Sequence, residues 1–298
     1  MTRILLAGAT GTLGRAIVRQ LVHSGQPARL IVRRPEALPN GLPDTVEVVT
    51  AEVTRPETLA GVMDGVGGVL TTVGITRQRD GLSYDDVDYG ANANLLNAAL
   101  DAGVPRFAYV SVFGGRQMRD VAICDAKERF VDELQGAPIE SVVIRPTGFF
   151  TDLDAFLDMA QRGRAWVFGD GQLRLNPVHP DDLARVCLRA LDGETSDVEV
   201  GGPDVLTHEA IARLAFEALG RAPRVTHIPD VVRRTALATV RWLPFSWVGP
   251  AEFFLASMGH SLVAPQHGTR SLGAYFRERA KPPRKLRTRR SLAPPQAV

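Results

Sequence analysis

The fold of this 298-residue chain is set by one stretch near its start, RILLAGATGTLGRAIVRQLVHSG at residues 3–25. Its first residues form an apolar run of strand length, and apolar side chains then recur at helical spacing from Leu13 to Val22. Three glycines lie between the two patterns. A glycine-rich turn from a buried strand into a helix is typical of a dinucleotide site, because bare backbone N–H groups and the positive helix end face the pyrophosphate.

Each glycine of this turn has a separate predicted task. Gly8 permits the tight turn, Gly11 lets the phosphate approach the backbone, and Gly14 lets the helix pack closely on the strand. We therefore predict a dinucleotide site here. The residues predicted to bind the cofactor in this turn are Gly8, Thr10, Gly11, Thr12, Leu13 and Gly14.

The next strand pattern, ARLIVRRPEAL at residues 28–38, indicates which dinucleotide is bound. An NAD site would carry an acidic residue at the end of this strand to accept a hydrogen bond from the ribose 2′-hydroxyl, but the sequence has Arg33 and Arg34 there. Two guanidinium groups suit the extra 2′-phosphate of NADP(H). The pattern therefore predicts NADP(H) as the cofactor.

Strand and helix patterns then alternate along the chain. Strands are expected at 46–53, 67–74, 104–114 and 139–150, and helices at 56–66 and 85–103. Such alternation predicts an α/β protein with a doubly wound parallel Rossmann sheet, whose ligand lies at the carboxyl ends of the strands. The residues placed in that crevice are Thr72, Val73, Gly74, Ser111, Val112, Phe113, Pro146, Thr147, Gly148, Phe149 and Phe150.

Three regions are expected along the chain. Residues 1–148 would form the NADP(H)-binding Rossmann domain, and residues 149–280 the remainder of the sheet and a small C-terminal substrate lobe. Residues 281–298 are a basic, proline-rich tail with six basic and no acidic side chains, so the rest of the chain carries net negative charge. We expect the tail to be disordered, and no nucleic-acid partner is predicted.

Composition narrows the cellular setting. No apolar run reaches the length of a membrane span, and the first residues enter a strand pattern without a signal-peptide layout, so a cytoplasmic protein with no membrane partner is expected. The only cysteines, Cys124 and Cys187, have no metal-site spacing, and no metal is predicted. A monomer or homodimer is expected.

Several motifs together resemble the atypical short-chain dehydrogenase/reductases, in the branch with NmrA-like, isoflavone-reductase-like and divinyl-chlorophyllide-reductase-like proteins. The resemblance covers roughly residues 3 to 280 and is carried by GATGTLG, IVRRP, VDYGANANLLNAALDAGVPRFAYVSVFGG, VIRPTGFF and NPVHPDDLARVCLRAL. It implies a Rossmann domain that binds NADP(H) and a lobe over the nicotinamide. It also implies an adenine contact for Glu52 and Val53, although the family usually has Asp at the first of these positions.

The family mechanism is only partly represented. In the ordinary mechanism a tyrosine protonates the substrate oxygen, a serine holds that oxygen, and a lysine binds the nicotinamide ribose. Ser111 and Lys127 match the serine and the lysine, but the tyrosine position holds Ile123. General acid catalysis is commonly worth ~10²–10⁴ in rate, so another proton source is needed. Lys127, a water, a tyrosine of the lobe and an acidic group on the substrate are the candidates.

Lysine usage supports a special role for Lys127. The chain has only three lysines, and the other two, Lys281 and Lys285, lie in the basic tail. A compact ammonium fits beside a ribose in a way that a forked guanidinium does not.

Aromatic density in the lobe is first of all typical of a core. If some of these side chains face the nicotinamide, the pocket is wide and apolar and suits a bulky, polycyclic aromatic substrate. The aromatic residues concerned are Phe149, Phe150, Phe156, Trp166, Trp242, Trp247, Phe253 and Phe254. The leading hypothesis is an NADPH-dependent ketoreductase for such a natural product, similar to the tyrosine-lacking ketoreductases of angucyclinone antibiotic biosynthesis. A reductase of enones or quinones and a non-catalytic NADP(H)-sensing regulatory or assembly protein are the alternatives.

Overall fold

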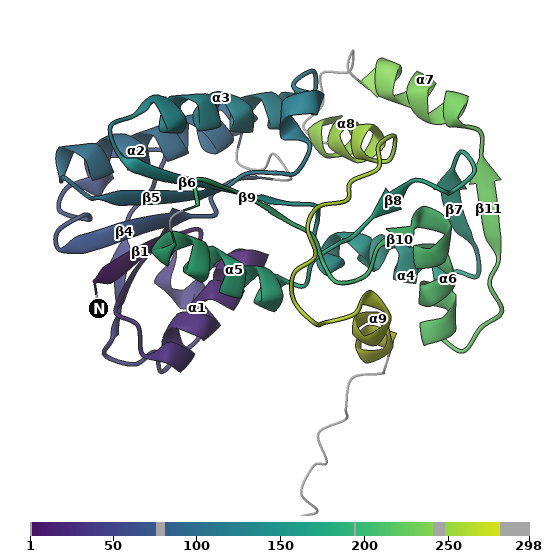
Figure 1. The fold of residues 1–298 in the computed structure, drawn as a ribbon, viewed down its shortest axis with the longest axis horizontal. Helices are drawn as coiled ribbons and strands as arrows, with labels where there is room; N and C mark the ends of the chain where they lie inside the picture. The colour runs from purple at the N-terminus through teal and green to yellow at the C-terminus, as the bar shows by residue number, and fades with distance from the viewer. Residues whose placement is uncertain (1, 76–80, 194, 241–247, 281–298) are drawn as a thin grey trace, which may run out of the picture.

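A computed structural model describes residues 2–75, 81–193, 195–240 and 248–280 of the chain. A seven-stranded parallel sheet with the order β3-β2-β1-β4-β5-β6-β9 forms its larger part (Figure 1). The strand order reverses between β1 and β4, which is where ligands bind in doubly wound sheets. The strands are β1 Arg3–Ala7, β2 Ala28–Val32, β3 Val46–Thr50, β4 Val66–Thr71, β5 Arg106–Val110, β6 Glu140–Pro146 and β9 Asp197–Val200.

Helices cover both faces of the sheet, as Figure 1 shows. One face packs on α1 (Thr12–Ser24) and α5 (Pro180–Asp192), and the other on α2 (Asn92–Asp101) and α3 (Ala122–Gly136). Each interface is a separate apolar core, because successive side chains of a strand point to opposite faces. The doubly wound α/β fold predicted from the sequence is confirmed.

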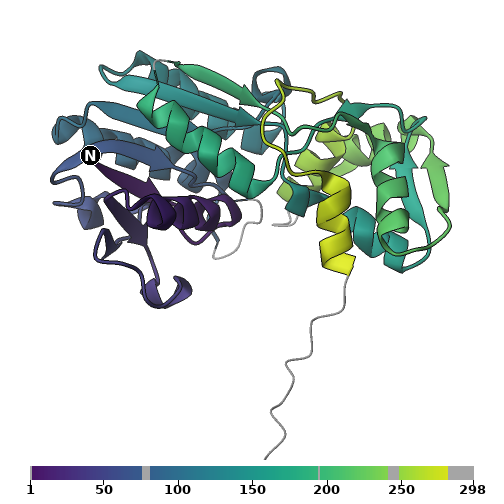
Figure 2. The ribbon, with the colours of Figure 1, turned by 60° about the horizontal axis from the view of Figure 1, so that its bottom comes forward.

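The chain leaves the sheet after β6 and builds a lobe beyond the carboxyl ends of the strands (Figures 1 and 2). Its core contains the buried side chains of Phe150, Phe156, Phe216 and Phe276. The chain returns to the sheet through α5 and β9, which pairs in parallel with β6, and then adds the remaining lobe elements. The boundary at residue 148 stays a prediction. The lobe elements are α4 Asp154–Gln161, β7 Ala165–Phe168, β8 Arg174–Leu175, β10 Leu206–Thr207, α6 His208–Ala218, β11 Val225–Ile228, α7 Asp230–Val240, α8 Val248–Ser257 and α9 Leu272–Ala280.

Two expected helices differ in the structure. Residues 56–66 contain only a 3₁₀ turn, Pro56–Leu59, because Gly61 and Gly65 take positive φ and stop a helix. The expected helix at 85–103 begins as a π-helix, Asp85–Ala91, and becomes α-helical only from Asn92. The wider π turn changes which side chains of this segment face the sheet.

No helix in the described part of the chain is both long and apolar enough to cross a bilayer. The tail predicted at residues 281–298 lies outside the described residues, as do Trp242 and Trp247.

Candidate functional site

The glycine turn between β1 and α1 has the geometry of a phosphate cradle. Gly8 has a φ of 87°, and a Cβ there would lie 2.4 Å from Thr72 Oγ1. A Cβ on Gly14 would lie 2.0 Å from the Gly8 carbonyl oxygen. Gly11 is different, since the nearest atom to its Cβ would be the Gly8 oxygen at 3.4 Å. The protein itself therefore requires Gly8 and Gly14, whereas an absent side chain at Gly11 keeps space for a ligand.

The start of α1 is open to a ligand. Gly11 is the N-cap residue and no side chain caps the helix, so the first backbone N–H groups keep their donor capacity. Thr10, Gly11 and Thr12 are exposed there. Leu13 is buried in the core, so only its backbone is able to meet a cofactor. These features fit a dinucleotide pyrophosphate at the helix N-terminus.

The two arginines predicted to select NADP(H) lie at the carboxyl end of β2. Arg34 is exposed, and the side chain of Arg33 is 53% exposed with its Nε 3.6 Å from Glu52 Oε2. Glu52 also accepts a hydrogen bond from Thr54 Oγ1 at 3.1 Å. The carboxylate at the end of β3 thus orients Arg33, and the guanidinium keeps donors for a phosphate.

The side chains of the remaining predicted cofactor residues mostly hydrogen-bond to the backbone or pack in the core, so few of their polar groups are available to a ligand. The Thr72 hydroxyl is 3.3 Å from the Ala7 carbonyl oxygen, and Thr147 Oγ1 donates to the Asn176 carbonyl at 2.6 Å. Val53 packs on the core beneath α2, and its carbonyl accepts from Asn94 Nδ2 at 3.0 Å. Val73 is buried, and Pro146 pairs with β9. Contacts of these residues with a cofactor stay predictions.

Lys127 lies in a buried pair at the carboxyl edge of the sheet. Its Nζ is 2.8 Å from Oδ1 of Asp88 and donates to the Tyr109 hydroxyl at 3.4 Å. Asp88 Oδ2 accepts from the backbone N–H of Ile75 at 3.2 Å. A Cβ on Gly74 would lie 2.6 Å from Asp88 Oδ1 and 2.9 Å from Lys127 Nζ. Gly74, predicted to bind cofactor, is thus the residue whose missing side chain admits this pair.

The ammonium keeps one donor for a ligand. Lys127 has three N–H bonds, of which Asp88 and Tyr109 take two, and the described residues supply no partner for the third. Its side chain is 13% exposed, whereas Asp88 is fully buried. This is the geometry that a lysine needs to bind ribose hydroxyls.

The charges of this pair argue against Lys127 as a proton donor. Burial opposes the charge on the ammonium, but the Asp88 carboxylate outweighs burial, so the pKa of Lys127 lies above its ordinary value. Desolvation also raises the pKa of Asp88, and Lys127 opposes that shift. An ammonium with a raised pKa releases its proton less readily. Lys127 therefore suits binding and electrostatic stabilisation.

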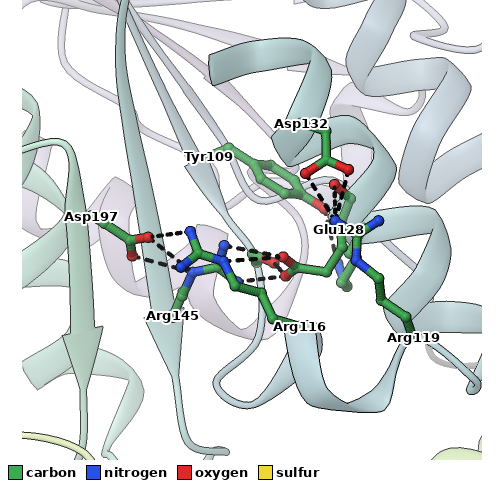
Figure 3. A network of polar contacts seen from close by, with 9 residues as sticks. Tyr109, Arg116, Arg119, Glu128, Asp132, Arg145 and Asp197 are labelled. Carbon is green, nitrogen blue, oxygen red and sulfur yellow. Dashed lines mark hydrogen bonds and ion pairs between the residues drawn. The ribbon is translucent and has the colours of Figure 1, made fainter. Parts of the chain in front are cut away.

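Ser111 faces a different carboxylate from the one that pairs with Lys127. Its Oγ donates to Glu128 Oε1 at 3.1 Å, and Arg145 forms two hydrogen bonds to the same carboxylate, one of them from Nη2 to Oε2 at 3.1 Å. Arg145 Nε also pairs with Asp197 of β9 at 3.2 Å, and Arg116 bridges Asp197 and Glu128 (Figure 3). The structure thus gives Ser111 a place in a network beside the crevice, and its substrate-holding role stays a prediction.

The tyrosine position of the family holds a packed aliphatic side chain. Ile123 is 7% exposed and lies in an apolar cluster with Tyr84, Val121 and Cys124, against Ala256 of α8. The cluster fills the place where an acid would stand.

Most aromatic residues proposed for a substrate pocket have other positions. Phe150 and Phe156 are core residues of the lobe, because their rings pack among its helices. Trp166 is 48% exposed and Phe254 46% exposed. Phe149 and Phe253 are partly buried. Phe149 packs beside the core under α1 and α5 and Phe253 beside the Ile123 cluster, so within the described residues these aromatic side chains do not gather in one pocket.

Sequence reasoning missed Asp88, Tyr109 and Glu128. Asp88 is one of three aspartates in the segment 85–88, and only the π-helix selects it as the inward one. Tyr109 lies within the strand expected at 104–114, and no pattern in the sequence singles it out. Glu128 follows Lys127 directly. The available signal for a buried partner was Arg145, a charged residue in the otherwise apolar strand with which Glu128 pairs.

Comparisons with known proteins agree with this geometry. A family model described as NAD(P)H-binding matches residues 8–194. A divinyl chlorophyllide a 8-vinyl-reductase of Zea mays is 30% identical over 296 residues of alignment, which cover 90% of this chain and 74% of that protein. A photosystem II assembly factor Ycf39 of Guillardia theta is 25% identical over 231 residues, 76% of this chain and 73% of that protein.

A solved structure shares the fold. The NADPH-dependent quinone oxidoreductase QOR2 of Escherichia coli, complexed with NADPH, superposes with a TM-score of 0.74 at 19% identity, over 93% of this chain and all of that chain. The chain spans between 63% and 74% of the length of the curated relatives from maize, rice, Arabidopsis thaliana and Guillardia theta. Its match to the family model and its identity with the maize reductase together place it: the chain belongs to the NAD(P)H-binding family, in the NmrA-like branch of the atypical short-chain dehydrogenase/reductases.

Proposed function

We propose that the protein is an NADPH-dependent reductase that delivers hydride to a carbonyl of an organic acceptor. The observation that carries this proposal is the buried Lys127 ammonium, held by Asp88 at 2.8 Å and with a donor to spare beside Gly74. A desolvated cation that binds the nicotinamide ribose would fix the cofactor for hydride transfer and stabilise the negative charge that develops on the acceptor oxygen. We expect it to act in the cytoplasm as a monomer or homodimer.

The cofactor supplies the hydride, and the chain supplies its position. The open start of α1 would hold the pyrophosphate, Arg33 and Arg34 the 2′-phosphate, and Lys127 the nicotinamide ribose. Arg33→Ala should therefore weaken NADPH binding about 10- to 100-fold and leave NADH binding nearly unchanged. Isothermal titration with both dinucleotides measures this. Equal losses of affinity for both would mean that Arg33 does not contact the 2′-phosphate.

The acceptor is proposed to be bulky and aromatic, in the manner of a polycyclic ketone. Phe149 and Phe253 are the partly buried aromatic residues that support this choice. The name of the maize relative, which acts on a vinyl group of divinyl chlorophyllide a, and the name of the quinone oxidoreductase favour an enone or a quinone instead. All three acceptor classes belong in one assay.

A non-catalytic assembly role is the second candidate. Ile123 in place of the acid favours it, together with the similarity to a photosystem II assembly factor. In that case the dinucleotide would be bound tightly and no acceptor would oxidise it.

The experiment measures NADPH binding first and turnover second, over polycyclic aromatic ketones, enones and quinones. Lys127→Met should abolish turnover and weaken NADPH binding, whereas Asp132→Asn, on the same helix at an exposed ion pair with Arg119, should change neither. With deuterated NADPH, deuterium at a new carbinol carbon establishes carbonyl reduction. Confirmed NADPH binding without turnover on any acceptor would favour the assembly role.

A further inference from the structure

A carbonyl that receives hydride also needs a proton, and several hydroxyl groups near the crevice already have acceptors in the fold. Ser111 donates to Glu128 at 3.1 Å, and Tyr275 donates to Asp154 at 3.0 Å. Tyr109 is completely buried in the core beneath α2 and α3. A proton donor for the acceptor would instead have a hydroxyl at the site that lacks a partner.

Tyr84 has such a hydroxyl. The residue directly precedes the π-helix Asp85–Ala91, and it is only 4% exposed. Its Oη has no hydrogen-bond partner among the residues that the structure describes. A buried hydroxyl without a partner lowers the stability of a fold, so it points to a ligand that supplies the missing acceptor.

Contacts place Tyr84 at the predicted site, because its side chain lies in one apolar cluster with Ile123. The cluster also includes or contacts chain neighbours of the three predicted site residues Gly74, Ser111 and Lys127, from three separate segments. These neighbours are Ile75, Val112 and Ala126. Tyr84 therefore lies where the three segments converge, beside the position that holds the acid in the family.

The charges of the Lys127 pair act on the Tyr84 phenol. Burial is the largest influence and, together with Asp88 and Glu252 of α8, raises the pKa of Tyr84 to about 12. Cys124 acts in the same direction, whereas the Lys127 ammonium lowers this pKa. The phenol therefore keeps its proton at neutral pH, and the ammonium stabilises the phenolate that remains after the proton is given up. An alkoxide formed by hydride transfer is a stronger base than this phenolate, so the proton moves to the alkoxide.

The hydroxyl is covered by backbone and not by a side chain. A Cβ on Gly249 would lie 2.3 Å from Tyr84 Oη, so a glycine is required over the phenol. Gly249 lies in the first turn of α8, whose carbonyl groups bond further along the helix. This turn therefore closes over the hydroxyl without giving it an acceptor.

We propose that Tyr84 binds the acceptor oxygen and is the proton donor that replaces the family's tyrosine. The inference rests on the proposed reductase function and deepens it. The carbonyl carbon gains a hydride from NADPH, which becomes NADP⁺, while the carbonyl oxygen takes the proton of the Tyr84 hydroxyl, so the product is an alcohol. The first turn of α8 moves aside to admit the acceptor, and the phenolate regains its proton from water when the alcohol leaves.

Tyr84→Phe removes the hydroxyl and leaves the ring in the cluster. With an acceptor that the wild type reduces, its turnover should fall by roughly 10²–10⁴, with the NADPH dissociation constant unchanged within about twofold. Tyr89→Phe is the matched control, since Tyr89 lies on the same π-helix and its hydroxyl bonds to Glu133 of α3. This control should retain turnover.

Urea denaturation separates a catalytic from a structural role of the hydroxyl. Removal of a buried hydroxyl that has no partner should leave the urea midpoint of Tyr84→Phe unchanged or higher than that of the wild type. A lower midpoint together with lower turnover would mean that the hydroxyl has a partner within the fold, and it would overturn the proposal.

The pH profile and the wild-type assay complete the test. Because the phenol has a pKa of about 12, wild-type turnover should show no loss as pH rises through neutrality. A loss there would indicate a carboxyl or imidazole acid and overturn the role of Tyr84. Turnover of Tyr84→Phe at the wild-type rate also overturns that role and leaves the reductase. No wild-type turnover on any acceptor overturns both proposals.

Discussion

Two neighbouring residues of α3 hold two buried ion pairs of opposite design. Glu128 has a complete set of partners, with two hydrogen bonds from Arg145, one from Ser111, and Arg116 nearby (Figure 3). Lys127 has Asp88 and a long contact to Tyr109, and nothing else in the described part of the chain. The first pair joins α3 to β6 and, through Asp197, to β9. The second pair ends at the crevice.

Two adjacent residues of α3 therefore have different roles, one structural and one functional. A buried charge with all its lone pairs occupied rigidifies the fold, whereas a buried charge with one spare donor carries a cost that a ligand relieves. We therefore read the Glu128 pair as structural and the Lys127 pair as the part of the site that awaits the cofactor.

The largest effect is expected from Arg145→Met. It leaves the Glu128 carboxylate buried without its cation, which should lower the free energy of unfolding by about 3–5 kcal/mol. Urea denaturation measures this, and NADPH affinity of the folded protein should change little. The double variant Glu128→Leu with Arg145→Met removes both charges and should recover much of the loss. A small loss in Arg145→Met alone would contradict a structural role.

Lys127→Met should show the opposite pattern, with a marked effect on NADPH binding and a smaller effect on the free energy of unfolding. Loss of the ammonium should weaken NADPH binding about 10- to 100-fold, or about 1.4–2.8 kcal/mol. Its loss of unfolding free energy should be smaller than that of Arg145→Met, because Asp88 is able to take up a proton. Fluorescence titration with NADPH and urea denaturation give the two numbers. Unchanged binding with a large stability loss would make this pair structural as well.

Alanine substitution of two glycines places one added methyl group beside each ion pair and so compares them directly. A Cβ on Gly74 would lie 2.6 Å from Asp88 Oδ1, and a Cβ on Gly115 would lie 2.6 Å from Glu128 Oε1. Both alanine variants should lose about 1–3 kcal/mol of stability from overpacking. Only Gly74→Ala should also weaken NADPH binding, by several-fold. Equal effects on binding would mean that the two pairs are coupled.

The smallest effect is a pH dependence. Desolvation raises the pKa of Asp88, so the folded state binds this proton more tightly than the unfolded state does, and its contribution to stability increases as pH falls through the raised pKa. Lys127 opposes the shift, so Lys127→Met should enlarge it. The stability gap between variant and wild type should narrow as pH falls through the raised Asp88 pKa, by about 1.4 kcal/mol for each unit of added shift. Denaturation at several pH values measures this, and a constant gap would contradict it.

The sequence was sufficient for those features that depend on local pattern. The glycine turn and the order of the strands along the chain follow from spacing, because backbone periodicity and the steric needs of a turn are written locally. Lys127 was found through the resemblance to the family. The partners of Lys127 and Ser111 were not accessible in this way. Which of Asp85, Asp86 and Asp88 turns inward depends on tertiary packing.

The aromatic residues show the same limit. Phe150 and Phe156 read equally well as pocket or core, since an apolar ring is favourable in both places, and the lobe uses them as core.

The π-helix Asp85–Ala91 has a consequence for how roles are carried between relatives. A π turn takes more residues per revolution than an α turn, so side chains before and after it point in directions that an ordinary helix of the same length would not give. A relative that forms an α-helix here would present a different side chain to its lysine, even with an aspartate aligned to Asp88. Whether a relative has this ion pair therefore depends on the hydrogen-bond pattern of its helix. An aspartate aligned with Asp88 does not establish it.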